Sequence, residues 1–152
     1  SRVTVPVHLD IAGDGNQAAE LRSLVQSLGL GDRVTFHGWL PTEVVYQLMQ
    51  ASRALIFPSI WHEPAGLVAY EAMINARATI ASRVGGIPEG VIDQVTGLLV
   101  EPNDIEGLAQ QIERLATDWT LANQLGETGR NFAIDKFSIP NHMTQLMQIY
   151  QQ

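Results

Sequence analysis

At the centre of the chain stands Phe57-Pro-Ser-Ile-Trp-His-Glu63-Pro-Ala-Gly66-Leu-Val-Ala-Tyr-Glu71-Ala-Met73. An apolar run at residues 54–57 leads into this stretch, and beyond Gly66 neither proline nor glycine occurs up to residue 76. The pattern predicts a strand, a turn and a helix opened by Pro64, with Glu63 at the mouth of the helix. A strand followed by a helix is the building unit of an α/β fold.

The mouth of this predicted helix suits a bound anion. Four backbone N–H groups would point out of it without intrahelical partners, and the positive end of the helix dipole adds to their attraction. They belong to Ala65, Gly66, Leu67 and Val68. A diphosphate fits such a site. His62 adjoins Glu63 and could touch a sugar or phosphate, although a single loop histidine is more often non-catalytic.

The two glutamates are spaced for a ligand with hydroxyls on both sides of its phosphates. In a continuous helix Glu71 would lie roughly 10–12 Å beyond Glu63 along the axis, at about 1.5 Å per residue. A nucleoside diphosphate sugar has this layout, because its sugar lies on one side of the diphosphate and the vicinal ribose hydroxyls on the other. Taken singly, each glutamate would more often be a solvated surface charge, and it is the combined stretch that favours the ligand.

Strand-like and helical segments alternate through the first two thirds of the chain, which predicts right-handed βαβ units and a parallel sheet. The expected strands are residues 5–12, 33–36, 54–57, 79–81 and 98–100. The expected helices are residues 17–28, 41–51, 64–76, a short one opened by Pro88, 107–117 with Asp104 as N-cap, 119–137 and 138–150.

Loops at the carboxyl ends of parallel strands bind ligands in open α/β sheets, and three further motifs fall on such loops. Gly13-Asp-Gly15 follows the first strand, where it permits close backbone approach or forms a plain tight turn. Trp39 and Leu40 follow the second strand and could flank a nucleobase, although core packing is slightly favoured for Trp39. Gly85-Gly86 is as consistent with a structural turn as with ligand proximity.

Composition limits the function classes. The chain has 152 residues, 45% of them hydrophobic and 16% charged, which is ordinary for one globular domain. A net charge of −7 with Lys136 as the single lysine argues against nucleic acid as a partner. No apolar run approaches the roughly 20 residues that cross a bilayer. There is no cysteine, so disulfides and thiolate metal sites are ruled out.

The histidines do not indicate a metal centre. His8 and His37 lie in strand-like segments and are interpreted as structural, and His142 is expected to be exposed on the last helix. Their spacing matches no local metal motif, and no Asp-x-Asp pair occurs. We therefore expect neither a metal nor another cofactor.

The spacing of Glu63 and Glu71 resembles the Glu-x7-Glu signature of retaining, GT-B-fold glycosyltransferases of group 1 (GT4-like). Alone, Gly13-Asp-Gly15 would be weak, because it lacks the third glycine of a dinucleotide fingerprint. An ordered set of motifs along nearly the whole chain carries the resemblance. The set is Leu9-Asp-Ile-Ala-Gly-Asp-Gly15, Arg33-Val-Thr-Phe-His-Gly38, Pro58-Ser59, Glu63-Pro64, Glu71-Ala-Met73, Ile80-Ala-Ser82, Gly85-Gly-Ile-Pro-Glu89 and Gly97-Leu-Leu-Val-Glu-Pro102.

This resemblance implies that residues 1–152 are the Rossmann-like, donor-binding half of a GT-B enzyme. It would bind a nucleotide-diphosphate sugar and transfer the sugar, with retention, to a sugar or lipid-linked acceptor. Glu63 is implied to orient the transferred sugar and Glu71 to hold the ribose. Double displacement through Glu63 is the less favoured mechanism. A cytoplasmic protein is expected, with any membrane contact made peripherally by the full-length protein.

Departures from the family pattern point to a truncated chain. The family's donor domain begins one strand earlier, with Gly-Arg and Lys-Gly segments that supply cations for the diphosphate, and it follows an N-terminal acceptor domain. Both are missing, so the isolated chain is expected to be inactive and to self-associate through exposed apolar surface. Ala65 replaces a common aromatic residue. Asn75-Ala-Arg-Ala78 replaces Gly-x-Pro, and Arg77 there either lies on the surface or weakens a tight turn.

Two other functions are weighed. A glycoside hydrolase could use Glu63 and Glu71 as acid and base, but their estimated separation exceeds the approximately 5–9.5 Å that such chemistry uses. A non-catalytic nucleotide-sugar-binding or assembly module is the stronger alternative.

Overall fold

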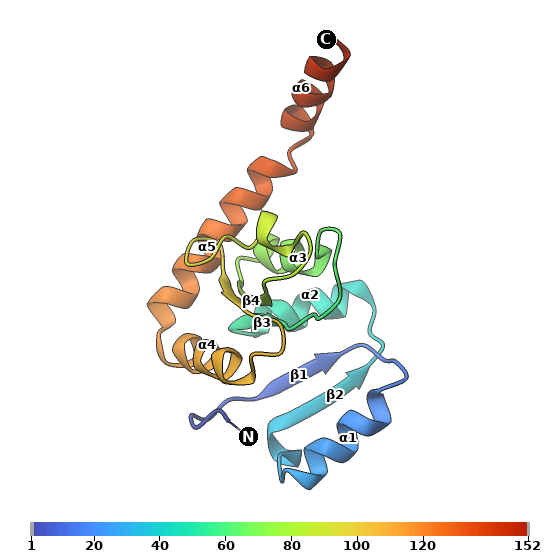
Figure 1. The fold of residues 1–152 in the computed structure, drawn as a ribbon, viewed down its shortest axis with the longest axis vertical. Helices are drawn as coiled ribbons and strands as arrows, with labels where there is room; N and C mark the ends of the chain where they lie inside the picture. Colours follow the sequence, from blue (N-terminus) through green and yellow to red (C-terminus); the bar gives the residue numbers. More distant parts are fainter. Residues whose placement is uncertain (1, 152) are drawn as a thin grey trace.

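The computed structural model describes residues 2–151 and confirms the α/β class (Figure 1). Strands and helices alternate up to the fourth strand, and helices end the chain. The elements are β1 (Leu9–Ala12), α1 (Ala18–Ser27), a 3-10 turn (Gly31–Arg33), β2 (Val34–Gly38), α2 (Thr42–Ala51), β3 (Ala54–Phe57), α3 (Leu67–Ile74), β4 (Ala78–Ser82), a 3-10 turn (Ile87–Glu89), β5 (Leu98–Val100), α4 (Ile105–Thr117), α5 (Trp119–Lys136) and α6 (Ile139–Tyr150).

The strands form two parallel sheets rather than one. β1 pairs with β2, and β4 pairs with β3 on one edge and β5 on the other. Within residues 2–151 no ladder joins β1 to β3. The β1–β2 sheet and α1 lie at one end of the molecule, beside the β3–β5 sheet and its helices (Figure 1). One edge of β1 and one edge of β3 therefore keep unpaired ladder groups.

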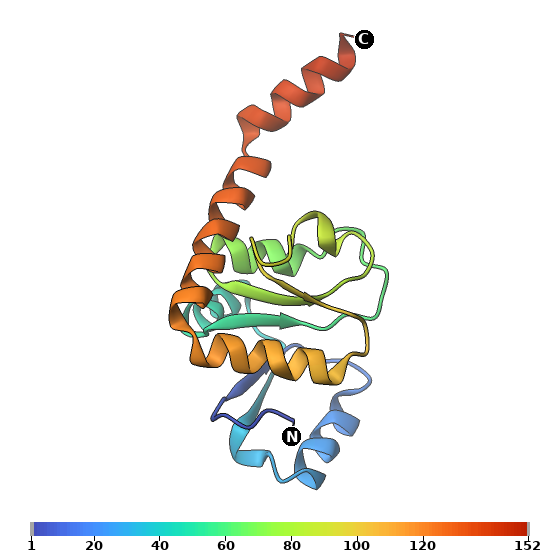
Figure 2. The same ribbon diagram turned by 60° about the vertical axis from the view of Figure 1, so that its left-hand side comes forward.

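The core lies on the two faces of the β3–β4–β5 sheet. β4 is buried along its whole length, and its successive side chains alternate between the faces. Ala81 packs in one cluster with Tyr70 and Met73 of α3, whereas Ile80 packs in the other with Leu115 of α4 and Leu125 of α5. Helices thus cover both faces of this sheet (Figure 2).

The last helix stands apart from this core. α6 extends away from the end of α5 in both views (Figures 1 and 2), and none of its residues is buried. Its N-terminus is capped by Ser138, whose hydroxyl accepts a hydrogen bond from the Asn141 N–H at 3.3 Å. Ile139, Ile149 and Tyr150 are exposed on it. His142 is exposed, as the sequence predicts.

Several predicted boundaries are confirmed to the residue or nearly so. The strands at 54–57 and 98–100 are β3 and β5, and the helices predicted at 41–51 and 17–28 are α2 and α1. Asp104 caps α4 as predicted, because its carboxylate accepts the Gly107 N–H at 2.9 Å. The helix itself starts earlier than predicted, at Ile105. The short helix opened by Pro88 is the 3-10 turn Ile87–Glu89.

The strand predicted at residues 5–12 is wrong in its first half, since β1 starts only at Leu9. Pro6 has no N–H to donate to a ladder. The Arg33 guanidinium donates to the Val5 carbonyl at 3.0 Å and to the Val7 carbonyl at 3.3 Å, so a side chain takes the place of a neighbouring strand.

The segment before β1 is also tied to α4. The Thr4 N–H and hydroxyl donate to the Glu113 carboxylate at 2.5 and 2.7 Å. These hydrogen bonds, the backbone one foremost, hold the pKa of Glu113 below its ordinary value because they favour the ionised form. The segment before β1 is therefore held by hydrogen bonds to side chains and not by a strand ladder.

The turn after α3 forms although glycine is absent from it. Ala76 adopts the left-handed conformation with φ of 53°, its N–H donates to the Met73 carbonyl at 2.8 Å, and the Arg77 N–H donates to the Ala72 carbonyl at 2.9 Å. Arg77 is half-buried. The turn is therefore made at the cost of a strained alanine.

Replacing Ala76 with glycine is expected to stabilise the fold. Glycine adopts this conformation without the Cβ clash, which outweighs its greater freedom in the unfolded chain. We expect Ala76→Gly to raise the free energy of unfolding by about 0.5–1 kcal/mol in urea titrations. Ala19→Gly, on the exposed side of α1, is the control and should lower it instead. A loss of stability in both variants would contradict the assigned strain.

Candidate functional site

The loops that follow the parallel strands meet in two pairs. The loops after β1 and β2 are joined by the Gly13 N–H, which donates to the Gly38 carbonyl at 2.7 Å. The loops after β3 and β4 are joined by the Gly86 N–H, which donates to the Glu63 carbonyl at 2.7 Å. The candidate residues therefore gather at the carboxyl ends of the strands, as predicted, but in two groups that follow the division into two sheets.

In the first pair, glycine is required by the backbone. Gly13 has φ of 128° and Gly38 has φ of 68°, both in the region that favours glycine. Gly15 is exposed, and its N–H donates a hydrogen bond to the carboxylate of the preceding residue, Asp14, at 2.8 Å. The tight-turn interpretation of Gly13-Asp-Gly15 accounts for these contacts, and its ligand contact stays a prediction.

Trp39 does not pack in the core. Its side chain is 78% exposed directly after β2, and Leu40 beside it is half-buried. The core-packing interpretation is therefore wrong, since the polypeptide leaves the sheet at Gly38 before the indole can reach the interior. A planar apolar surface is left at the carboxyl end of the strands. Contact of this surface with a nucleobase stays a prediction.

The predicted helix start is wrong. Gly66, with φ of 65°, is the N-cap, and α3 begins at Leu67, so Pro64 and Ala65 belong to the preceding loop. A continuous helix cannot pass through a left-handed residue. Of the four predicted free N–H groups, those of Leu67 and Val68 lie in the first turn of the helix.

Glu63 lies in this loop, and the estimated 10–12 Å separation along one helix axis therefore does not apply to it. Glu71 is on α3, half-buried, and its carboxylate has no hydrogen-bond partner in residues 2–151. His62 is exposed, and its suggested ligand contact stays a prediction.

Glu63 is held at both backbone atoms and at its side chain. Its N–H donates to the Trp61 carbonyl at 2.8 Å, and its carbonyl accepts the Gly86 N–H. The Ser59 hydroxyl lies 3.3 Å from Glu63 Oε1 and donates to it. The residue as a whole is half-buried.

The glycine pair after β4 is the structural partner of Glu63. A Cβ atom added at Gly85 would lie 2.4 Å from the Glu63 carbonyl oxygen, and one added at Gly86 would lie 2.0 Å from the Pro64 carbonyl oxygen. Gly85 also has φ of 57°. Any other residue type would push the Glu63–Pro64 backbone away, so the structural-turn interpretation of this pair is supported by close packing.

Two features of the site are missed by the sequence interpretation. Pro58-Ser59 was recognised as a motif, but nothing in it showed that the hydroxyl meets Glu63. Arg83 comes directly after β4 and just before the glycine pair in the chain, and its guanidinium pairs with Glu101 at 3.1 Å and Asp93 at 3.6 Å. An arginine just after a predicted strand is the signal that could have located it.

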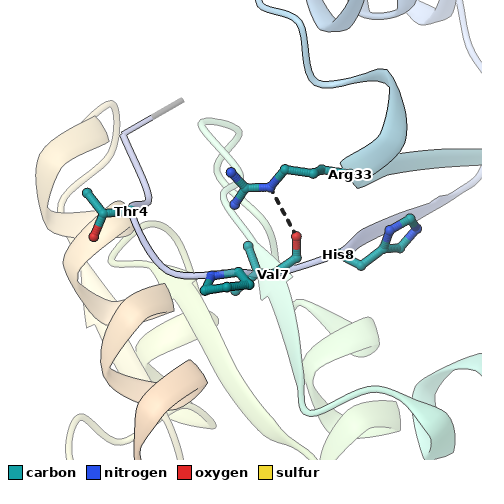
Figure 3. Close-up of a pocket in the computed structure, with 5 residues that line it drawn as sticks. Thr4, Val7, His8 and Arg33 are labelled. Atoms are coloured by element: carbon teal, nitrogen blue, oxygen red, sulfur yellow. Dashed lines mark hydrogen bonds between the residues drawn. The ribbon is translucent and has the colours of Figure 1, made fainter.

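A surface hollow of about 470 Å³ lies elsewhere (Figure 3). It is lined by Thr4, Pro6, Val7, His8 and Arg33, where the Arg33 guanidinium reaches the Val7 carbonyl. None of the predicted site residues lines it. The hollow belongs to the segment before β1 and does not contribute to the candidate site.

The structural interpretation of His8 and His37 fits their contacts. His37 Nε2 lies 2.7 Å from the Asp10 carboxylate, and His8 Nε2 lies 2.8 Å from the Thr35 hydroxyl. Among residues 2–151, no group of three or more histidine, aspartate or glutamate side chains is arranged to hold a metal ion. No helix in the same range is long and apolar enough to cross a membrane.

The chain was compared with models of known protein families, and one of them matches most of it. The family model described as "Glycosyl transferases group 1" matches residues 2–132. The chain belongs to this family. The predicted resemblance is thereby confirmed.

Two relatives of this group 1 glycosyl transferase chain are named as different enzymes. It is 38% identical over 143 residues to alpha-maltose-1-phosphate synthase of Mycolicibacterium smegmatis, covering 89% of this chain and 37% of that protein. It is 31% identical to alpha-D-kanosaminyltransferase of Streptomyces kanamyceticus, covering 93% of this chain and 36% of that one. The chain thus spans a little over a third of the length of these relatives.

Solved structures agree on the fold. Sucrose-phosphate synthase of Thermosynechococcus elongatus superimposes with a TM-score of 0.82 at 39% identity, covering 95% of this chain and 38% of that one. HepE of Anabaena, solved in complex with UDP and glucose, superimposes with a TM-score of 0.88 at 26% identity, covering 99% and 42%. The chain therefore has the fold of part of a GT-B glycosyltransferase.

Proposed function

We propose that this chain is the donor-binding domain of a retaining glycosyltransferase that uses a nucleotide-diphosphate sugar. One observation carries the proposal: Glu63 is fixed by hydrogen bonds immediately before α3, and Glu71 lies on that same helix. The complex of HepE with UDP-glucose supports the class of ligand.

In the proposed complex the diphosphate lies at the start of α3. The N–H groups of Leu67 and Val68 and the positive end of the helix dipole would stabilise the charge that develops as the diphosphate leaves. Glu63 would orient the transferred sugar through its hydroxyls, and Glu71 would accept hydrogen bonds from the ribose. Trp39 and Leu40 would flank the base. Gly13, Gly15, His62, Pro64, Ala65 and Gly66 would complete the donor pocket.

We further propose that the domain takes one more strand between its two sheets. The unpaired edges of β1 and β3 support this, because a strand seated between them would complete both ladders. The acceptor, a sugar or a lipid-linked sugar, would be bound with an N-terminal domain of the full-length protein. We propose that the protein acts in the cytoplasm and that its reaction does not require a metal ion.

A donor-turnover assay of the full-length protein tests the function. The protein would be offered uridine, guanosine and adenosine diphosphate sugars, and calorimetry would show which of them binds. We expect one nucleotide series to bind and to release its nucleoside diphosphate only when an acceptor is present. Tight binding without turnover for any acceptor class would instead favour a non-catalytic nucleotide-sugar-binding or assembly module.

Replacing Glu71 with alanine is expected to weaken binding of the bare nucleoside diphosphate by about 10- to 100-fold, through loss of charged hydrogen bonds to the ribose. Calorimetry on the full-length protein measures the change. The control is Glu43→Ala, an exposed glutamate in the first turn of α2, which should leave the affinity unchanged. Equal affinities of wild type and Glu71→Ala would show that Glu71 does not hold the ribose.

A further inference from the structure

We infer that Ser59 is a positioning residue for Glu63, and that it acts by fixing the carboxylate rather than by touching the substrate. The inference rests on the proposed function, in which Glu63 orients the transferred sugar. It concerns a hydroxyl that lies in the loop after β3, four residues before the carboxylate it contacts.

The orientation of the Ser59 hydroxyl is set by its neighbours. Its oxygen accepts the Trp61 N–H at 3.2 Å, which leaves its single proton to be donated elsewhere. Two acceptors lie within reach: Glu63 Oε1 at 3.3 Å and the Trp61 carbonyl at 3.5 Å. The carboxylate is both nearer and charged, so the proton goes to Glu63.

The backbone of Glu63 is already fixed by other contacts. Its N–H and carbonyl are both bonded, and the Gly85-Gly86 pair packs against it so closely that no Cβ atom fits between. Only the side-chain torsions of Glu63 remain to be fixed, and the Ser59 hydrogen bond fixes them. A carboxylate that must meet a sugar hydroxyl within a few tenths of an ångström benefits from this preorganisation.

Trp61 belongs to the same hydrogen-bonded loop as Ser59 and Glu63. Ser59 and Glu63 both hydrogen-bond to the main chain of Trp61, whose indole is 71% exposed. The loop is therefore ordered through its backbone and not through burial of its apolar side chains. Removing one hydroxyl would loosen the carboxylate without removing any core packing.

The test compares Ser59→Ala and Ser59→Thr in the full-length protein. Ser59→Ala is expected to lower the turnover number by about tenfold, the effect of one hydrogen bond to a charged group, with the donor KM changed by less than about threefold. Ser59→Thr keeps the hydroxyl and should restore most of the turnover. The matched control is Ser52→Ala at the opposite end of β3, where a half-buried serine donates to the Leu48 carbonyl at 2.8 Å.

A double-mutant cycle separates positioning from a general structural effect. In the Glu63→Gln background the sugar-orienting charge is gone, so adding Ser59→Ala should change turnover by about twofold or less. A full tenfold loss in that background, a loss equal to that of Ser52→Ala, or an effect on KM alone would overturn the inference. If the wild-type protein released no nucleoside diphosphate from any donor, the proposed function would fail, and the role of Ser59 with it.

Discussion

Replacing Glu63 with glutamine in the full-length protein is expected to lower the turnover number by about a hundredfold or more, with little change in the donor KM. Glutamine keeps the size of the side chain and an oxygen for the Ser59 hydroxyl, but it removes the negative charge that orients the sugar. Because this orientation matters most as the glycosidic bond breaks, the loss falls on the transition state and not on binding.

Steady-state kinetics with the donor identified by calorimetry measures this effect. Glu127→Gln, an exposed position on α5, is the control and should leave turnover unchanged. Thermal melting of both variants checks that the loop and α3 remain folded. An unchanged turnover number together with a raised donor KM would show that Glu63 serves binding alone.

The second large effect is a loss of sugar transfer when residues 1–152 are studied without the rest of the full-length protein. Residues 1–152 should fold cooperatively, because the β3–β5 sheet is covered by helices on both faces and has a continuous core. They should transfer no sugar. Arg83, which precedes the glycine pair in the chain, is already paired with Glu101 and Asp93, so it offers little charge to neutralise a diphosphate.

The same chain is expected to self-associate. The edges of β1 and β3 are unpaired, and Ile139, Ile149 and Tyr150 are exposed along α6. Circular dichroism, thermal melting, size-exclusion chromatography and a transfer assay would be run on residues 1–152 and on a longer chain that includes the upstream sequence. We expect cooperative melting without transfer in the short form and transfer in the long form. Donor-dependent transfer by residues 1–152 alone would contradict this prediction.

Much of the fold is predictable because its signals are local. β3 and β5 are short apolar runs ended by turn residues, and α2 opens directly after Pro41. Asp104 and Ser138 mark helix starts by their own side chains, which accept N–H groups three residues on. Such signals need no knowledge of distant residues. The order of strands and helices, and with it the α/β class, follows from them.

The candidate site is predictable only in outline. The sequence correctly locates Glu63 and Glu71 around one turn and helix, but it places the helix start three residues too early. From the sequence, Gly66 is interpreted as a residue inside the helix opened by Pro64. In the structure it is left-handed, and a Cβ atom there would lie 3.0 Å from side-chain atoms of both Ile87 and Phe57, which favours glycine at this position. That choice depends on a residue 21 positions away, since 87 − 66 = 21.

By itself, then, the sequence determines the order of elements and most of their boundaries, and it locates the two candidate carboxylates, because periodicity, capping and turn residues act over a few positions. Only the tertiary structure decides how Glu63 is held. Ser59 reaches it across a turn, and Gly86 reaches it from the loop after another strand. It also decides where β1 begins, since the Arg33 guanidinium takes the Val5 and Val7 carbonyls. Such contacts form between segments that chain folding brings together, and no local pattern encodes them.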